Sequence, residues 1–458
     1  DPELVIVAEV TPETEARIMA AKPPNVHIER SQRLSYGFAP TPVQRKDPGL
    51  IPLSSEGFQT KIKVTGKNGV GIADAEVFAV GELWTHRATT DSTGVCELDV
   101  FGDTPETITS LLIRPRKDHW SRFVEFPALT PNGNHEIGIR GIATADDRGT
   151  DRAGWGLKAL GVDHLAPEVD GRGVRIAIID SGLAAGHRDL GAIVTGETVV
   201  SDDPDGWQND VIGHGSHVAG VIGAELNLRG MKSIAPGAEI IPLKLFPGGE
   251  TQQLVQAMNR AIILQVDIVN LSLGMPSESP AVSECIRRAR AAGIAVIAAA
   301  GNSSGQVMFP ARMPEVMAVS AFGKDGTFPP DSNHLQQRAT NSSGTPIAST
   351  ADGLFFAKFS CFGPEIDLTA PGVAVVSSVP DDGYQAMDGT SMACPHVVAI
   401  AALALSSRAE FSSGEYSTPT AKRVDTLFRR LRESCQNPPG LGGTDQIGAG
   451  VPNVQTLL

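Results

Sequence analysis

Residues 388–396 read DGTSMACPH and run directly into VVAIAALALSS at 397–407. This apolar, small-residue tract predicts a buried helix with Ser391 in its first turn, and Pro395 is tolerated because it lies near the helix start. The N–H groups and the macrodipole at that end favour negative charge, so a serine there can attack a carbonyl and hold the resulting oxyanion if a base lies nearby. A lone serine in this position is more often an ordinary helix cap.

Two further stretches favour catalysis over a simple cap. Residues 174–180, VRIAIID, are typical of a buried parallel strand with Asp180 at its carboxyl end, where open α/β sheets carry their sites. Residues 213–220, GHGSHVAG, place His214 among small residues at the start of another predicted helix. The chain therefore supplies an aspartate, a histidine and a serine in that order.

Six short motifs extend this pattern over the last two thirds of the chain. DSG, GHGSHVAG, NLSLG, AAAGN, TAPG and GTSMACPH follow one another between residues 150 and 458. Over that range the chain resembles the subtilisin-like serine peptidases, the subtilase family, whose triad has the same order. The serine context differs from the G-x-S-x-G elbow of α/β-hydrolases. The resemblance implies a serine endopeptidase acting on peptides or proteins, with no cofactor required for its chemistry.

From residue 151 onward, apolar strands alternate with helix-like segments. This alternation predicts an α/β fold, a doubly wound and mainly parallel sheet with right-handed crossovers. We expect strands at 174–179, 238–245, 266–271, 294–300 and 316–320, and helices near 214–226, 251–264, 279–292 and 391–407. Residues 324–358 are polar and longer than the family pattern, which predicts a surface loop that shapes the cleft.

The first 150 residues differ in character from the rest. Strand patterns near 4–8 and 26–33 flank a helix start at Pro12, a small α+β segment that suits either an inhibitory prosegment of the family or a simple packing layer. Short alternating runs follow, which predict an all-β sandwich weakly similar to carboxypeptidase-regulatory or transthyretin-like modules. The predicted division is an N-terminal segment at 1–57, a sandwich at 58–140, a linker at 141–150 and a catalytic domain at 151–458. We expect the N-terminal parts to contact the catalytic domain.

The resemblance assigns roles to the matching residues. Ser391 is the nucleophile, His214 the general base and then acid, and Asp180 the carboxylate that orients the imidazole. Chemistry agrees, because a serine hydroxyl is a poor nucleophile until a base takes its proton. Asn302 is the expected second oxyanion donor beside the Ser391 N–H. The walls expected for an added substrate strand and its specificity pocket are Ser272, Leu273, Gly274, Ala299, Ala300 and Gly301.

Two departures from the family pattern concern specificity. Only six residues, 303–308, separate Asn302 from Phe309, and Met308 stands where a small residue is frequent. We therefore expect Met308 to narrow the pocket and to favour small or medium apolar side chains before the scissile bond.

A structural calcium site is the one metal site that the resemblance implies. Asp189 and Asn227 match side-chain ligand positions of the family, and Asp151 is a candidate third ligand; hard oxygen ligands suit calcium. Ordinary loop polarity is the alternative, and Arg229 within the same loop argues against a metal. The acidic cluster Asp202, Asp203, Asp205 and Asp210 is interpreted as a solvated loop.

Other polar residues receive structural interpretations. We expect His217 and His396 to be hydrogen-bonded core histidines, His187 to lie in a surface loop, and Cys394 to serve packing. The five cysteines are too scattered for a disulfide framework or a zinc site, although one pair remains open.

The length and net charge of the chain limit the number of domains and the kinds of partner that we expect. A chain of 458 residues suggests two or three domains, and a net charge of −14 argues against nucleic acid or an anionic membrane as a partner. Serines, a proline and a histidine interrupt the longest apolar tract, so we predict no membrane span. The chain begins Asp1-Pro2 without a methionine, which fits either a removed signal or a trimmed chain, and we favour secretion over a cytoplasmic location.

Two alternatives to a general endopeptidase remain. One is a processing peptidase of narrow specificity that its N-terminal domains regulate. The other is a binding protein on a subtilase scaffold, in which the sandwich is the functional part. A complete set of Asp180, His214, Ser391 and Asn302 argues against the second, since a scaffold needs none of them.

Overall fold

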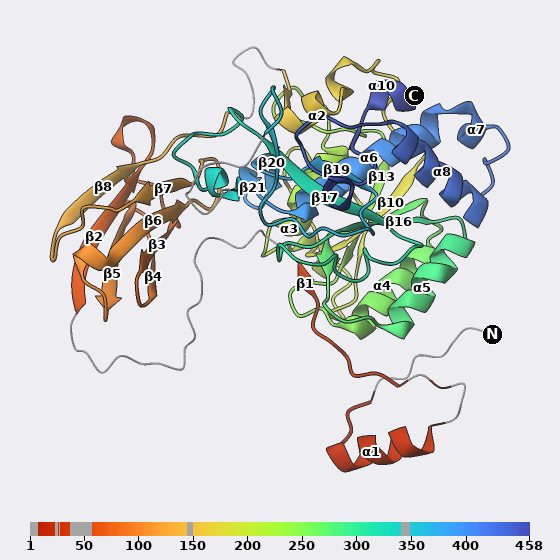
Figure 1. The fold of residues 1–458 in the computed structure, drawn as a ribbon, viewed down its shortest axis with the longest axis horizontal. Helices are drawn as coiled ribbons and strands as arrows, with labels where there is room; N and C mark the ends of the chain where they lie inside the picture. The colour runs from red at the N-terminus through yellow and green to blue at the C-terminus, as the bar shows by residue number, and fades with distance from the viewer. Residues whose placement is uncertain (1–7, 23–25, 27, 37–56, 144–149, 340–348) are drawn as a thin grey trace.

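The computed structural model describes residues 8–22, 26, 28–36, 57–143, 150–339 and 349–458. Its largest unit is a mainly parallel sheet surrounded by helices (Figure 1). In spatial order its strands are β11 (Glu197–Thr198), β13 (Glu239–Lys244), β10 (Arg175–Asp180), β14 (Ile268–Leu271), β16 (Ala295–Ala299), β17 (Met317–Lys324) and β18 (Leu354–Phe356), and β19 (Leu368–Pro371) also pairs with β17. Of these, β18 runs antiparallel to β17, and the other pairings are parallel.

Helices cover both faces of this sheet, because its strands are apolar on both sides. In β10, Ile176 and Ile178 join a core formed with α3 (His214–Gly223) and α6 (Thr390–Ser407). The alternate residues Ala177 and Ile179 join a second core formed with α4 (Thr251–Ile263) and α5 (Pro280–Ala291). The predicted α/β doubly wound fold is therefore confirmed, and each predicted strand and helix of this unit is present with shifted ends.

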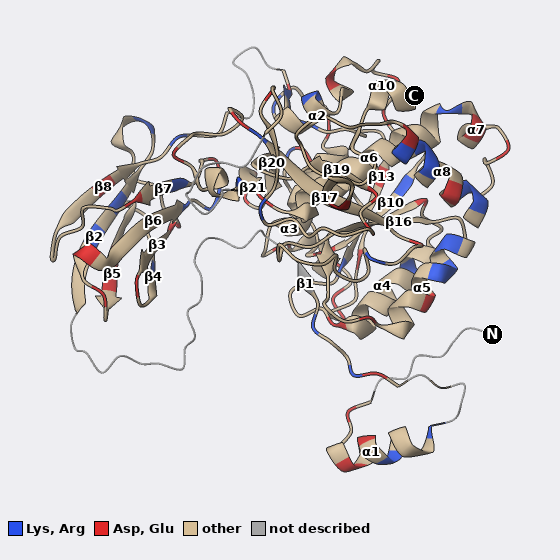
Figure 2. Ribbon diagram, viewed as in Figure 1, with Lys and Arg blue, Asp and Glu red and all other residues tan. Residues whose placement is uncertain are grey.

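Shorter elements complete this unit. The helices are α2 (Trp155–Ala159), α7 (Ala409–Ser412), α8 (Ala421–Glu433), α9 (Thr444–Ile447) and α10 (Val454–Leu457), with 3-10 turns η3 (Val162–His164), η4 (Gly206–Gln208) and η5 (Asn333–Gln337). The strands are β9 (Arg152–Ala153), β12 (Met231–Lys232), β15 (Leu273–Gly274), β20 (Val375–Val379), β21 (Gly383–Met387), β22 (Cys435–Gln436) and β23 (Val451–Pro452). In Figure 2 basic and acidic residues alternate along the ribbons of α5 and α8, and Arg290 of α5 pairs with Asp425 of α8 at 2.6 Å.

The helix α6 passes through the middle of this unit. Among the described residues it is the one helix long and apolar enough to cross a membrane, and 89% of it is buried inside the protein. That burial is the property of a core helix in a folded domain.

Residues 57–138 form two packed sheets with a core of their own. The sheets are β5-β2-β8 and β4-β3-β6-β7, built from β2 (Gly57–Thr65), β3 (Glu76–Gly81), β4 (Thr85–Thr89), β5 (Val95–Phe101), β6 (Ile108–Arg114), β7 (Arg122–Glu125) and β8 (Asn134–Gly138), with short turns η1 (Lys67–Gly69) and η2 (Pro105–Thr107). Alternate residues such as Ile62, Val77, Leu98 and Leu111 point into the space between the sheets. We call this unit the sandwich.

The sandwich is joined to the rest of the protein by the segment between β6 and β7. The backbone N–H of Asp118 donates to Tyr384 O at 2.6 Å, and the N–H of Phe123 donates to Asp331 O at 2.7 Å. The ring of Trp120 meets the edge of His334 at a centroid distance of 5.7 Å. The predicted surface loop at 324–358 is thus partly wrong, because its described residues Asn333 and His334 are buried under the sandwich.

Within its described residues, the N-terminal segment forms one helix and one short strand. The helix α1 (Pro12–Ala21) is capped by Thr11, buries none of its residues and stands apart in Figure 1. The predicted strand at 26–33 is wrong, since β1 (Ser35–Tyr36) forms later and pairs antiparallel with β15 instead of within the segment. The strand predicted at 4–8 falls mostly outside the described residues.

Candidate active site

Four elements bring the predicted catalytic residues to the carboxyl edge of the sheet. Asp180 is the last residue of β10, and Asn302 follows the end of β16 by three residues. His214 is the first residue of α3 and Ser391 is the second residue of α6, and these two helices pack against each other. Residues far apart in sequence therefore meet at one edge, as expected where parallel strands end.

Asp180 and His214 form a buried pair. The two carboxylate oxygens lie 2.8 and 2.9 Å from His214 Nδ1, and the side chains are 1% and 0% exposed. The N–H of Ser181 donates to Asp180 Oδ1 at 2.7 Å, which holds the carboxylate in place. Because Nδ1 donates to Asp180, a neutral His214 keeps the lone pair on Nε2, as a general base requires.

The backbone around Ser391 is fixed by Ser272. Ser391 Oγ donates to Ser272 O at 3.1 Å, and Ser272 Oγ donates to Ser391 O at 3.0 Å. Asn270 in turn donates from Nδ2 to Ser272 Oγ at 3.0 Å. The segment that leads into β15 therefore positions the first turn of α6.

Asn302 is oriented by Thr390, the residue before Ser391. The N–H and the hydroxyl of Thr390 both donate to Asn302 Oδ1, each at 2.9 Å, and Thr390 Oγ1 accepts from the N–H of Gly301 at 3.1 Å. Two donors on one atom assign the oxygen to that side, so the amide nitrogen of Asn302 points the other way. This orienting role of Thr390 was not predicted from the sequence.

Asp210 is a second residue whose role was missed. It accepts from Gly213 N at 2.8 Å and from Ser216 N and Oγ at 2.9 and 2.6 Å, so it caps the helix that begins at His214. Its burial raises the pKa of the carboxyl group. The interpretation as a solvated loop is wrong for Asp210, although Asp202 and Asp203 are exposed. The signal was its position, four residues before a helix start.

Structural roles were also predicted for His217, His396, His187 and Cys394. His217 donates to Val375 O at 2.9 Å and His396 to Met392 O at 2.7 Å, and burial lowers their pKa values to about 3 and about 4. They are core histidines, as predicted, and Cys394 is buried beside Ile297 O. The prediction for His187 is wrong, because this ring is 2% exposed and donates to Gly383 O at 3.0 Å. All five cysteines are free.

Met308 lies between the two predicted pocket walls. A Cβ placed on Gly274 would lie 3.1 Å from Met308 Cβ, and one placed on Gly301 would lie 2.6 Å from Met308 Cγ. The backbone is held on both sides, since Met308 N donates to Ala300 O at 2.9 Å and Phe309 N donates to Met275 O at 3.0 Å. Glycine on each wall leaves room that the methionine fills.

The three predicted calcium ligands lie together. Asn227 Nδ2 donates to Asp189 Oδ1 at 3.2 Å, and the N–H of Arg229 donates to Asp151 Oδ1 and Asn227 Oδ1, both at 3.0 Å. Asp189 Oδ2 accepts from Met231 N and from the hydroxyl of Tyr384. Carboxylate and amide oxygens of the kind that bind calcium therefore lie close together here. Each of them accepts a hydrogen bond from another group of the protein. The described residues contain no group of three or more His, Cys, Asp or Glu side chains placed to hold a metal.

The chain is similar in sequence to known proteins. A sequence model described as the subtilase family matches residues 171–428. Subtilisin DY from Bacillus licheniformis is 33% identical over 310 residues, which cover 66% of this chain and 97% of that protein. Subtilisin E from Bacillus subtilis is 34% identical over 293 residues, 62% of this chain and 65% of that protein. A thermostable alkaline protease from Halalkalibacterium halodurans is 34% identical over 57% of this chain and 65% of its own length.

Proposed function

Because the chain belongs to the subtilase family, and is a serine endopeptidase on that evidence, we propose that Asp180, His214 and Ser391 are its catalytic triad and Asn302 its side-chain oxyanion donor. The observation that carries this assignment is the buried contact of both Asp180 oxygens with His214 Nδ1, at the start of the helix that packs on α6.

The proposed reaction follows from these atoms. His214 Nε2 takes the proton of Ser391 as Oγ attacks the scissile carbonyl, and Asp180 stabilises the imidazolium that forms. His214 then gives the proton to the leaving amine, and water hydrolyses the acyl-enzyme with the same base. The Ser391 hydroxyl must first turn from Ser272 O, its hydrogen-bond acceptor in this structure, toward the imidazole.

The oxyanion would be held from two sides. The N–H of Ser391 lies in the first turn of α6, where the helix dipole favours negative charge. The Asn302 amide nitrogen supplies the second donor, and Thr390 fixes its direction before the reaction begins. Such preorganised donors need no rearrangement as charge develops. The test is hydrolysis of an unstructured protein such as casein by the full chain, and loss of that activity after treatment with a serine-directed fluorophosphonate.

The N-terminal segment runs along the proposed substrate strand. Ser35 pairs with Gly274, and Leu34 donates from its N–H to Gly249 O at 3.1 Å. Gln32 exchanges hydrogen bonds with Thr251, and Glu29 accepts from Ser279 Oγ at 2.7 Å. We therefore propose that residues 28–36 bind as an extended peptide on the acyl side of the cleft, which favours the prosegment interpretation over a packing layer. We also propose the division at 1–57, 58–140, 141–150 and 151–458, which is supported by the sandwich strands lying between Gly57 and Gly138 and by β9 beginning at Arg152.

Met308 is proposed to limit the residue before the scissile bond. We expect wild type to prefer Ala, Val or Leu over Phe and Tyr by about tenfold to a hundredfold in kcat/KM, because a bulky residue must displace the methionine at a cost of about 1–3 kcal/mol. Met308→Gly should gain activity on Phe and Tyr. Profiling both proteins with one peptide library measures this, and a wild type that already prefers Phe or Tyr would refute it.

Calcium is proposed to stabilise the fold through Asp189, Asn227 and Asp151. Rotating the Asn227 amide would turn its oxygen toward Asp189, and both carboxylates are already in place. Binding to the folded state alone adds about 2.7 kcal/mol at a hundredfold excess over the dissociation constant. Melting temperatures should therefore rise with calcium over chelator in wild type and in the exposed control Asp202→Ala, but not in Asp151→Ala. Identical melting curves of wild type with calcium and with chelator would refute the proposed calcium site.

A further inference from the structure

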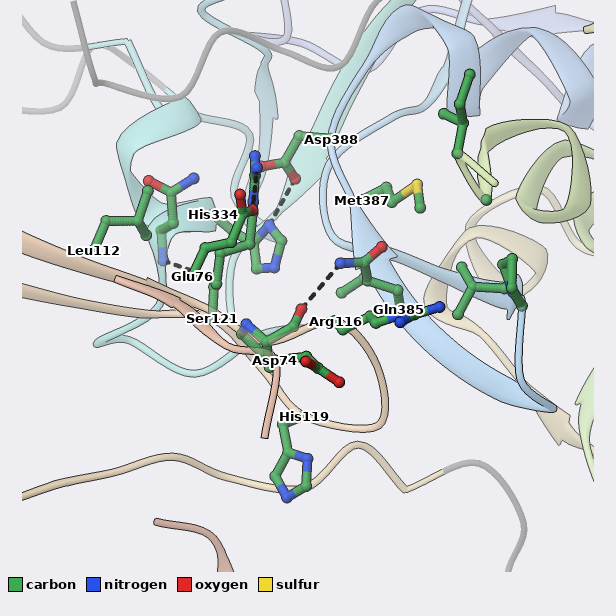
Figure 3. A pocket seen from close by; sticks show the side chains of 18 of the residues that line it. Asp74, Glu76, Leu112, Arg116, His119, Ser121, His334, Gln385, Met387 and Asp388 are labelled. Atoms are coloured by element: carbon green, nitrogen blue, oxygen red, sulfur yellow. Dashed lines mark hydrogen bonds and ion pairs between the residues drawn. The ribbon is translucent and has the colours of Figure 1, made fainter. Parts of the chain in front are cut away.

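We call the described residues from 150 to 458 the catalytic unit. A cavity of about 460 Å³ lies where the sandwich meets this unit (Figure 3). This is within the range of small-molecule and peptide sites. One wall comes from the sandwich, through Asp74, Glu76, Arg114, Arg116 and His119. The opposite wall comes from residues 211–213 and from the hairpin of β20 and β21, and η5 closes one end with Asn333 and His334.

The cavity is lined by residues that neighbour two of the proposed catalytic residues in the sequence. Gly213 directly precedes His214, and Asp388 lies three residues before Ser391; both line the cavity. The residues of β15 and Met308 do not line it. A peptide whose acyl part lies on β15 must continue past Ser391 and His214, because His214 protonates the leaving amine.

We propose that this cavity binds the part of a peptide substrate that follows the scissile bond, and that the sandwich supplies one wall of that subsite. The inference rests on the proposed function, since it uses the position of the scissile bond at Ser391. It gives the sandwich a role in substrate recognition.

Buried polar atoms without partners support a ligand at this place. His334 is 4% exposed and Asn333 7%, and neither His334 Nε2 nor Asn333 Oδ1 has a hydrogen-bond partner within the described parts of the chain. His334 Nδ1 donates to Asp388 Oδ1 at 2.7 Å, as Figure 3 shows, which leaves Nε2 as an acceptor. Both atoms are hydrogen-bond acceptors on residues that line the cavity, and buried acceptors are costly to leave unpaired.

Donors for the peptide carbonyls come from the sandwich. Arg116 is 57% exposed at its side chain and pairs with Asp381 at 2.7 Å through one nitrogen, which leaves further N–H groups available. Charges of both signs line the cavity, so a polar peptide suits it better than an apolar one.

The sandwich wall is fixed relative to Ser391. Tyr384 N donates to Asp118 Oδ1 at 3.0 Å, and Gln385 Nε2 donates to Pro115 O at 3.1 Å. These bonds attach the sandwich to β21, which leads directly into Asp388 and α6. A wall that discriminates between substrates must keep a fixed position relative to the nucleophile. The two hydrogen bonds to β21 hold the sandwich in such a position.

The test compares two substrates in one preparation of the full chain. One is a quenched peptide with four residues after the scissile bond, and the other has the same acyl sequence with a p-nitroanilide leaving group. The ratio of their kcat/KM values does not depend on how much enzyme residues 28–36 hold inactive. Ala386→Phe, which fills the cavity, should lower this ratio by about tenfold or more, and Arg116→Ala should lower it in the same direction.

Lys61→Ala is the matched control, because Lys61 is an exposed cation on β2, in the sheet away from the cavity. The ratio of the two kcat/KM values should be the same in Lys61→Ala as in wild type. Arg116→Ala, at an exposed site, guards against a folding defect in Ala386→Phe, and melting temperatures are recorded for each variant. An unchanged ratio in both cavity variants overturns the inference. Failure of wild type to hydrolyse either substrate would instead overturn the proposed function.

Discussion

Ser391→Ala is expected to abolish peptide hydrolysis while the chain stays folded. The substitution removes the attacking oxygen and one hydrogen bond to Ser272 O, which contributes about 0.5–1.5 kcal/mol of stability. Residual rates should approach the background left by binding and the oxyanion donors alone. Peptide assays together with a melting curve separate lost chemistry from lost fold.

The N-terminus of the same variant gives an independent readout. If residues 28–36 bind in the cleft as a substrate does, wild type should shorten its own N-terminus and Ser391→Ala should keep it. Mass spectrometry of the two purified chains measures this. Full peptide hydrolysis by a folded Ser391→Ala protein would refute the assignment of the nucleophile.

Asn302→Ala is expected to lower kcat by about 10²–10³-fold with little change in KM. This range is the one known for loss of a single oxyanion donor in a subtilisin. The physical reason is that the amide acts on the charged intermediate, which the ground state lacks.

Asn302→Asp is the matched control for this prediction. A carboxylate keeps an acceptor for the two Thr390 donors but removes the N–H donor, so it separates orientation from oxyanion stabilisation. We expect Asn302→Asp to be at least as slow as Asn302→Ala. A loss below tenfold in both variants would contradict the proposed role.

The catalytic unit was largely predictable because its signals are local. Each strand is a short apolar run. Asp180 is the last residue of a strand, and His214 and Ser391 lie in the first turns of helices. Parallel strands with right-handed crossovers then leave few ways to arrange these ends.

Contacts between distant segments were not predictable from local pattern. Asp210 is a local exception, because its position four residues before the helix start at His214 distinguishes it from the exposed Asp202 and Asp203. His187 reads as a loop residue, but its acceptor Gly383 O lies 196 residues away. The partner of β1 is likewise 237–239 residues along the chain, and local pattern wrongly predicted a strand at 26–33.

The most direct test of the account is to map the residue that a fluorophosphonate modifies. The full chain is treated, digested and sequenced by mass spectrometry, with Ser391→Ala treated in parallel. We predict a single adduct, on Ser391, whose formation tracks the loss of peptide hydrolysis and which is missing from the variant. An adduct on another serine that tracks the loss, or hydrolysis that continues unchanged when Ser391 is fully modified, would contradict it.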